Sequence, residues 1–209
     1  MAVPHEGFVS RYLNRRISRP LSTLLARTPL TPNQVSVASF AIALASFALF
    51  LGGYNIWAGL AAQASSIVDG ADGDLARLKG MATKFGGFFD AILDRYADIA
   101  ITAGLAYWAY AFESRSPATL VGSVGLLAIV GALMVSYTRA RAEASLGSAF
   151  HGLAGSLASR DARLLLIMIG AILGQALATL ALLAVLTNAV VIWQVALAAR
   201  RPHTAAPPH

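Results

Sequence analysis

Long apolar runs divided by short polar turns form the main pattern of this chain. A helix needs about 20 mostly apolar residues to cross the hydrocarbon core of a bilayer, and the sequence reaches that length several times. The first run opens with Thr31 and Pro32, a pair typical of a helix start, and continues to about Leu51. We predict six membrane-spanning helices, at residues 31–51, 56–79, 83–112, 118–139, 160–173 and 176–199.

The first 30 residues follow a different pattern. Apolar residues recur there at helical spacing and arginines lie between them: Phe8, Tyr12, Leu13, Ile17, Leu21, Leu24 and Leu25, with Arg11, Arg15, Arg16 and Arg19. This predicts a basic amphipathic helix on the membrane surface, and a soluble arm is the alternative. The segment lacks an uninterrupted apolar core and a small-residue cleavage site, so it does not resemble a signal peptide.

Three parts are therefore expected: an amphipathic juxtamembrane segment at 1–30, a six-helix domain at 31–200 and a disordered tail at 201–209. The composition agrees, because 57% of the residues are apolar and 12% are charged, about half the charged fraction of a soluble domain. We predict an all-α integral membrane protein. The absence of cysteine excludes disulfides and thiolate metal sites, and the histidines are too scattered to form a ligand cluster.

Basic residues indicate which side of the membrane each turn faces. Six spans place the N-terminus, the 79–83 turn, the 140–159 loop and the C-terminus on one side, with every lysine and arginine except Arg115. By the positive-inside tendency, that side is the cytoplasm of a multi-pass plasma-membrane protein. The net charge of +6 then reflects topology, and no nucleic-acid partner is expected.

Six of the ten acidic residues are gathered within residues 66–98: Asp69, Asp72, Asp74, Asp90, Asp94 and Asp98. Residues three or four positions apart share a helix face, so Asp69 with Asp72, and Asp90 with Asp94, form two pairs on neighbouring helices. Asp74 falls about 140° around the helix from Asp69. We expect it to face solvent or the end of a neighbouring helix, and Asp98 is assigned no role.

Carboxylates inside an apolar helix bundle are costly unless they are paired or bound to a cation. The basic residues near them in sequence, Arg77, Lys79 and Lys84, lie at the water end, so we predict a divalent cation between the two pairs. Oxygen ligands without histidine or cysteine favour Mg²⁺, Mn²⁺ or Ca²⁺ over zinc. With Arg77 available for a phosphate, this site on the cytoplasmic side indicates metal-assisted phosphoryl transfer.

Other interpretations of the acids were weighed. An EF-hand is excluded, because position 12 counted from Asp69 or Asp72 is Gly80 or Thr83 instead of Glu. A charged helix–turn–helix that only anchors the membrane face stays open. A small-solute transporter needs polar breaks near the membrane midplane of several helices, usually with internal repeats, and the sequence has neither.

The acids belong to a longer motif, Asp69-x2-Asp72-Gly73-x2-Ala76-Arg77-x8-Gly86-x3-Asp90-x3-Asp94. It resembles the signature of the CDP-alcohol phosphotransferase family in every residue and spacing. The six-span organisation and the "TPNQVS" segment at the start of the first span are also similar to this family. The resemblance implies an enzyme that moves a phospho-alcohol group from a CDP-alcohol to an acceptor hydroxyl and releases CMP, and it implies a homodimer among membrane lipid.

The resemblance also implies a role for each residue of the motif. Two Mg²⁺ or Mn²⁺ ions would be held by four aspartates, Asp69, Asp72, Asp90 and Asp94. Asp94 would in addition act as the catalytic base that takes the proton of the acceptor hydroxyl. The cytidine and pyrophosphate of the donor would be cradled by Gly73, Ala76, Arg77 and Gly86.

Arginines at the cytoplasmic ends of spans four and five are candidates for acceptor recognition: Arg139, Arg141, Arg160 and Arg163. Because guanidinium groups match phosphate geometry, we predict that Arg139, Arg160 and Arg163 bind the phosphate of a phosphorylated acceptor. Ordinary interfacial arginines are the alternative.

The segments around these arginines, with the N-terminal segment, are most similar to the di-myo-inositol-phosphate-phosphate synthase branch of the family. This implies transfer from CDP-inositol to inositol 1-phosphate. Members of that branch often carry an N-terminal cytidylyltransferase domain, which is not recognised in this sequence. The close alternative is a phosphatidylinositol-phosphate synthase, whose donor is the lipid CDP-diacylglycerol, followed by a phosphatidylglycerol-phosphate synthase.

Overall fold

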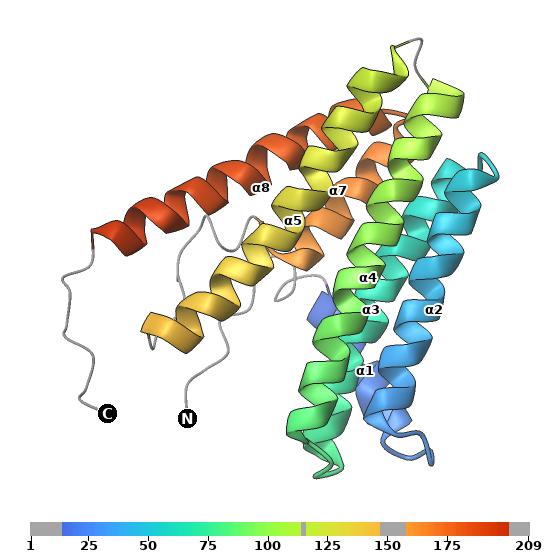
Figure 1. Ribbon diagram of the computed structural model, residues 1–209. Helices are drawn as coiled ribbons and strands as arrows, with labels where there is room; N and C mark the ends of the chain where they lie inside the picture. Colours follow the sequence, from blue (N-terminus) through green and yellow to red (C-terminus); the bar gives the residue numbers. More distant parts are fainter. Residues whose placement is uncertain (1–13, 114–115, 147–157, 201–209) are drawn as a thin grey trace.

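The computed structural model describes residues 14–113, 116–146 and 158–200, and every regular element in these ranges is a helix (Figure 1). The elements are α1 Arg15–Leu25, α2 Pro32–Leu51, α3 Asn55–Leu78, α4 Lys84–Trp108, η2 Ala109–Glu113, α5 Ala118–Leu146, α7 Arg160–Ile172 and α8 Ala176–Ala199. The short π-helical element η2 follows α4 directly. The all-α prediction is confirmed for the described residues.

The helix starts lie within one residue of the predicted ones, and side-chain caps hold several of them, including the predicted cap Thr31. Thr31 and Gln34 make a reciprocal capping box at the start of α2, with Pro32 as the first helical residue. The Thr83 hydroxyl accepts a hydrogen bond from the backbone N–H of Gly86 at 2.9 Å, and Ser159 caps α7 in the same way. These caps fix where the helices that carry the acids and arginines begin.

The end of α5 differs from the prediction. The helix was expected to stop near residue 139, but it continues to Leu146. Arg139 and Arg141 therefore lie within a helix instead of at its end. The residues after Arg141 include alanine, glutamate and leucine, which are good helix formers, so the charged residues did not mark a boundary.

Three of the described helices are long and apolar enough to cross a membrane: Pro32–Leu51, Ala118–Ser145 and Ala176–Ala199. The helices α3 and α4 have 24 and 25 residues, but they carry the aspartates. The 13 residues of α7 extend about 20 Å at 1.5 Å per residue, which is less than the hydrocarbon thickness of about 30 Å. Length and composition alone therefore support three of the six predicted spans.

The helices pack so that α2 contacts both α3 and α4, while α7 lies against α3 and α8 against α5. In Figure 1, α5 and α8 lean away from the group formed by α2, α3 and α4. Close approach depends on small residues. A Cβ at Gly59 of α3 would lie 2.9 Å from the Cβ of Ala171 of α7, and one at Gly170 would lie 1.8 Å from the Thr179 hydroxyl.

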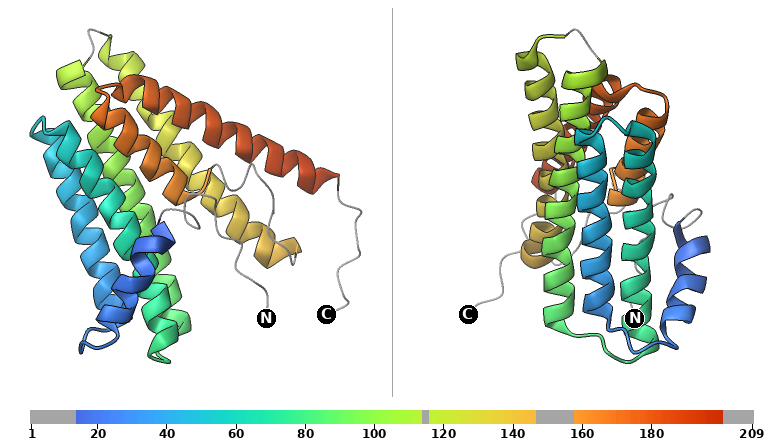
Figure 2. Two further views of the ribbon diagram at one scale, coloured as in Figure 1. Left: turned by 180° about the vertical axis from the view of Figure 1, so that it is seen from behind. Right: turned by 90° about the vertical axis from the view of Figure 1, so that its right-hand side faces the viewer.

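The first helix, α1, lies against α3 (Figure 2). Its buried residues are Ser18 and Ser22, whereas Ile17 and Leu24 are 49% and 63% exposed. Ile17 and Leu24 thus point away from the bundle, and the interfacial position of this helix stays a prediction. The earlier part of the predicted amphipathic segment and the 201–209 tail lie outside the described residues.

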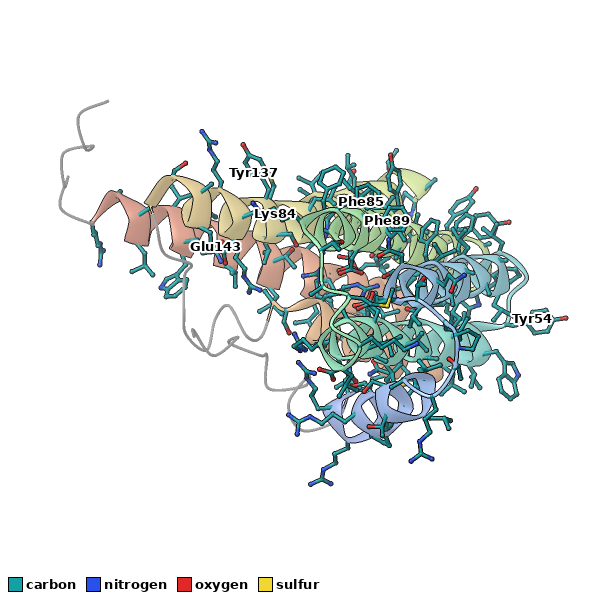
Figure 3. The ribbon with its side chains drawn as sticks, turned by 90° about the horizontal axis from the view of Figure 1, so that it is seen from below. Tyr54, Lys84, Phe85, Phe89, Tyr137 and Glu143 are labelled. Carbon is teal, nitrogen blue, oxygen red and sulfur yellow. The ribbon has the colours of Figure 1, made fainter. Side chains whose placement is uncertain are left out.

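An aromatic face lies on the outside of α4. The rings of Phe85 and Phe89 stack with centroids 5.9 Å apart (Figure 3), and Phe88 and Tyr96 are 65% and 61% exposed. Tyr54, in the turn between α2 and α3, also projects outward (Figure 3). Large exposed apolar residues are costly in water and suit contact with lipid or another protein.

Candidate active site

The carboxylates meet where the end of α3 faces the start of α4. Oxygen atoms of Asp69, Asp72 and Asp90 lie within 4.8 Å of one another. Asp72 is buried and accepts a hydrogen bond from Ser36 of α2. The buried Oδ1 of Asp90 has no hydrogen-bond partner in the part of the chain that is described. Three converging carboxylates with an unsatisfied buried oxygen suit a divalent cation, so these residues fit the predicted metal.

Asp94 lies one turn further along α4 and faces α7. Its Oδ1 is 3.0 Å from Arg160 Nη1, and its Oδ2 is 3.6 Å from Arg95 Nη2. The same nitrogen of Arg160 lies 2.7 Å from Asp69 Oδ2. Asp94 therefore stands between the three carboxylates and the arginines, and its role as a metal ligand stays a prediction.

The countercharge at the site corrects one premise of the sequence argument. The acids were treated as having no basic partner except residues at the water end, yet Arg160 reaches two of them from α7. Its side chain is only 11% exposed. This partner was missed because it lies far away in the sequence and reaches the acids through the packing of α7 against α3. Arg160, with Arg95 at 3.6 Å from Asp94, still leaves part of the negative charge of the four acids uncompensated.

A cavity of about 200 Å³ opens beside the carboxylates. Its walls include all four predicted donor residues and two of the acids: Gly73, Ala76, Arg77, Gly86, Asp72 and Asp90. A Cβ at Gly73 would meet only Arg77 Nη2, at 4.0 Å, so this glycine leaves open space in the cavity. A Cβ at Gly86 would lie 3.1 Å from Thr83 Oγ1 and 3.2 Å from Asn33 Oδ1. Gly73 therefore borders the cavity, whereas Gly86 also allows close local packing.

Asp74 points to the end of a neighbouring helix, which is one of the two predicted outcomes. Its Oδ2 lies 2.5 Å from Arg15 Nη1 at the start of α1, and its Oδ1 lies 2.6 Å from Arg77 Nη2. The Asp74 side chain is 15% exposed, compared with 59% for Arg77. Asp74 thus links α1 to an arginine of the cavity wall.

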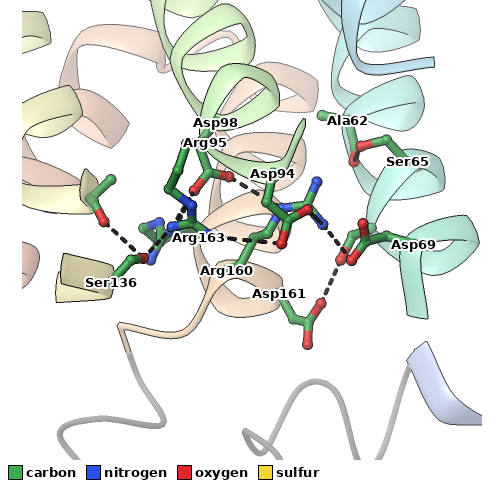
Figure 4. Close-up of polar contacts among 12 residues, drawn as sticks. Ala62, Ser65, Asp69, Asp94, Arg95, Asp98, Ser136, Arg160, Asp161 and Arg163 are labelled. Carbon is green, nitrogen blue, oxygen red and sulfur yellow. Dashed lines mark hydrogen bonds and ion pairs between the residues drawn. The ribbon is translucent and has the colours of Figure 1, made fainter. Parts of the chain in front are cut away.

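The predicted acceptor arginines Arg160 and Arg163 meet at Asp98, which is 4% exposed (Figure 4). Arg163 Nη2 lies 2.6 Å from Asp98 Oδ2, and Arg160 Nε lies 3.3 Å from Asp98 Oδ1. Arg95 Nη1 is 3.5 Å from Asp98 Oδ2 and also donates a hydrogen bond to Ser136 of α5. The sequence predicts no role for Asp98. Its place four residues after Asp94 is the signal that puts it on the same face of α4.

The other two arginines of the sequence analysis are placed differently. Arg139 is half-buried on α5, close enough to Arg163 and Arg95 for charge repulsion. The ion pairs at Asp98 join Arg160 and Arg163. Arg141 is exposed and lines a separate cavity of about 260 Å³ between α5 and α8. The structure therefore brings two of the three predicted acceptor arginines together, and Arg139 stays a prediction.

A buried polar network next to Arg160 was not predicted. Asn14 Nδ2 donates to Ser66 Oγ and to Asp161 Oδ1, each at 2.9 Å. Ser66 Oγ also donates to Asp161 Oδ1 at 2.6 Å, and Gln63 Nε2 donates to Asn14 Oδ1 at 2.8 Å. The network joins the start of α1, the middle of α3 and the start of α7. No sequence spacing indicates it, because its members come from three separate segments.

These features define a class of protein. It is all-helical in the described residues, and some of its helices are apolar and long enough to cross a membrane. Its carboxylate cluster lies between a cavity and a group of arginines. The chain belongs to the CDP-alcohol phosphatidyltransferase family, whose sequence profile matches residues 29–201. The predicted family membership is confirmed, and with it the prediction of an enzyme. This family assignment disfavours the transporter and the simple membrane anchor.

Two relatives illustrate the range of activities that similar chains carry. A Rubrobacter xylanophilus protein named bifunctional IPC transferase and DIPP synthase is 43% identical over 185 residues, covering 88% of this chain and 41% of the relative. A Mycobacteroides abscessus phosphatidylinositol phosphate synthase is 37% identical over 169 residues, covering 79% of this chain and 73% of the relative. The chain thus spans less than half the length of the bifunctional relative.

Crystal structures of Mycobacterium tuberculosis phosphatidylinositol phosphate synthase have the same fold. The structure with CDP-DAG bound gives a TM-score of 0.73 at 27% identity, covering 93% of this chain and 99% of that chain. The structure in complex with manganese and citrate gives a TM-score of 0.75 at 27% identity, covering 92% and 94%. A member of the same fold therefore binds both a CDP-linked molecule and a divalent metal.

Proposed function

We propose that this protein is a metal-dependent CDP-alcohol phosphotransferase whose acceptor is an inositol phosphate. The observation that carries the proposal is that the same carboxylate cluster lies beside the cavity on one side and contacts Arg160 on the other. Asp72 and Asp90 line the cavity with Gly73 and Arg77, while Asp69 and Asp94 contact Arg160. A donor in the cavity and a phosphorylated acceptor at the arginines would then meet at the acids.

The donor half of the site is formed by Gly73, Ala76, Arg77 and Gly86. The open space over Gly73 admits a ligand close to the helix backbone, and Arg77 is positioned to contact a phosphate. Two divalent ions, Mg²⁺ or Mn²⁺, are proposed to bind among the acids: Asp69, Asp72, Asp90 and Asp94. When bound, they supply positive charge that offsets the diphosphate and stabilises CMP as it leaves.

The reaction forms one bond and breaks one. The acceptor hydroxyl oxygen bonds to the phosphorus that carries the donor alcohol, and the bond from that phosphorus to the bridging oxygen of CMP breaks. Asp94 takes the hydroxyl proton on a carboxylate oxygen, because it lies between the metal-side acids and the arginines. The surrounding helices hold donor and acceptor side by side, which removes much of the entropic cost of their encounter.

The acceptor half of the site is formed by Arg160 and Arg163, with Arg139 as a third contact from α5. Arg160 Nη1 is buried and has no hydrogen-bond partner of good geometry among the described residues, although two carboxylates lie close by. Such a nitrogen can still donate to a phosphate oxygen. Inositol 1-phosphate is the proposed acceptor. CDP-inositol is the proposed donor, and the lipid CDP-diacylglycerol is the alternative, as the names of the relatives suggest.

The chain is further proposed to cross the plasma membrane six times, with the active site on the cytoplasmic side. In this arrangement, α1 lies on the surface with Ile17 and Leu24 toward lipid. The exposed residues of α4 recur at helical spacing along one face: Phe85, Phe88, Ile92 and Tyr96. This face would contact lipid or the second subunit of a homodimer.

Purified protein in lipid nanodiscs tests the proposal directly. It is given CDP-inositol or CDP-diacylglycerol, each with inositol 1-phosphate and Mg²⁺, and CMP release is measured. Release with one donor that depends on both acceptor and metal supports the proposal and identifies the donor. Release that does not need the acceptor phosphate contradicts the acceptor assignment, and absence of release with both donors contradicts the proposed pair of substrates.

A further inference from the structure

Two of the six clustered aspartates, Asp74 and Asp98, lie outside the four-acid group, and both contact arginines. Asp74 holds the cavity arginine Arg77. Asp98 holds Arg160 and Arg163. Each of these acids therefore serves the arginines of one half of the proposed site, donor or acceptor.

The contacts of Asp98 fix the orientation of two guanidinium groups. Its Oδ2 binds Arg163 at 2.6 Å, where both side chains are about 5% exposed or less, and its Oδ1 binds Arg160 Nε at 3.3 Å. A planar guanidinium held at Nε cannot turn freely, so its Nη1 stays directed at Asp69 and Asp94. Removing the Asp98 charge would leave Arg163 with the backbone carbonyl of Ala158, and Arg160 with Asp69 and Asp94. Each buried guanidinium would then lose one of the contacts that fix its orientation.

The contacts of Asp74 restrain an arginine that is otherwise mobile. Arg77 is 59% exposed and would sample many rotamers in the cavity wall. Asp74 holds its Nη2 at 2.6 Å, and Arg15 of α1 braces the other oxygen of Asp74 at 2.5 Å. Because this pair is partly open to solvent, its effect should be smaller than that of Asp98.

We infer that Asp98 and Asp74 are positioning residues, each for a different substrate. Asp98 orients Arg160 and Arg163 for the acceptor phosphate. Asp74 orients Arg77 for the donor diphosphate. The inference rests on the proposed function. Neither residue touches the reacting atoms, so each acts through its arginines. The consequence is that loss of one acid impairs one substrate and spares the other.

Steady-state kinetics of Asp98→Asn and Asp74→Asn, with each substrate varied in turn, test this separation. Asp98→Asn should raise the acceptor KM on the order of ten- to a hundredfold, as expected for a misplaced binding group, with the donor KM nearly unchanged. Asp74→Asn should raise the donor KM by about two- to fivefold, with the acceptor KM unchanged. Glu113→Gln is the matched control. Glu113 is also a hydrogen-bonded carboxylate, since it accepts from the backbone N–H of Leu177, but it lies in η2, beyond the end of α4 that is opposite the acids.

A second readout separates positioning from a general structural role. Competitive inhibition by inorganic phosphate against inositol 1-phosphate should weaken in Asp98→Asn, whereas competitive inhibition by inositol, which lacks the phosphate, should not change. If Asp98→Asn does not fold, Asp98→Glu takes its place, because glutamate keeps the charge but its longer side chain displaces the contacts with Arg160 and Arg163; the same acceptor-only effect is expected.

The inference is overturned if both KM values rise together in either variant, or if neither rises. It is also overturned if inhibition by inositol and inhibition by inorganic phosphate weaken equally. Failure of the proposed function would look different, because the unmodified protein would then release no CMP with inositol 1-phosphate and either donor.

Discussion

Arg160 Nη1 lies 2.7 Å from Asp69 Oδ2, so an arginine proposed to bind the acceptor is also the nearest countercharge of an acid proposed to bind metal. This contact joins α7 to α3. A change at Arg160 should therefore alter the metal requirement of the acids, while the donor cavity around Gly73 and Arg77 is left intact.

Metal dependence is the first expectation. The four acids outnumber their two arginine partners, Arg160 and Arg95, and so hold excess negative charge. EDTA should therefore abolish CMP release, and Mg²⁺ or Mn²⁺ should restore it. Asp69→Asn, Asp72→Asn and Asp90→Asn should each lower turnover by more than about a hundredfold, because a bound metal contributes several kcal/mol to the transition state. Mn²⁺ binding followed by electron paramagnetic resonance should weaken in the same variants.

The control for these variants is Glu113→Gln, which removes an acid far from the cluster and should keep full activity. Each aspartate variant should also elute from size exclusion in detergent as the unmodified protein does. Substantial turnover in any of the three would mean that the carboxylates do not share a metal site.

Asp94 should behave differently from the other acids. As the proposed base, it is needed for proton removal more than for donor binding. Asp94→Asn should therefore lower kcat by about a hundredfold or more while the donor Kd, measured by titration with a CDP-alcohol, changes little. Loss of donor binding as severe as that of Asp72→Asn would show that Asp94 acts only as a ligand.

Gly73 gives a steric test of the donor cavity. A side chain there would extend into open space, so Gly73→Leu should fold normally and yet weaken donor binding strongly. Gly59→Leu is the contrasting variant, since its Cβ would meet the Ala171 methyl group and the Met168 backbone. It should lower Tm through overpacking. Gly86→Leu is less informative, because Thr83 and Asn33 crowd the same position.

An unchanged donor Kd in a folded Gly73→Leu protein would mean that the donor does not bind in this cavity. The same result would not affect the acceptor assignment, because that assignment rests on Arg160 and Arg163 of α7 and not on the cavity that Gly73 borders. Donor binding and Tm should be measured on the same preparation, so that lost affinity is not confused with lost fold.

The sequence could predict the helices and the acids because both depend on local signals. Caps such as Thr31 and Thr83 mark where helices begin, and the spacing of Asp90 and Asp94 places them on one face. The partners of these acids could not be predicted in the same way. The contacts of Arg160 with Asp69, and of Asn14 with Asp161, depend on how α7 and α1 pack against α3. No local pattern encodes that packing.

Replacing Arg160 tests directly whether this residue binds the acceptor phosphate. A charge-assisted hydrogen bond contributes about 1.5–3 kcal/mol, so Arg160→Ala should raise the acceptor KM roughly ten- to more than a hundredfold. The donor KM should stay nearly constant. Because Arg160 and a divalent cation repel each other at the same carboxylates, the variant should need the same or less Mg²⁺ for half-maximal activity. A higher Mg²⁺ requirement, or equal increases in both KM values, would mean that Arg160 supports the cluster and does not bind the acceptor.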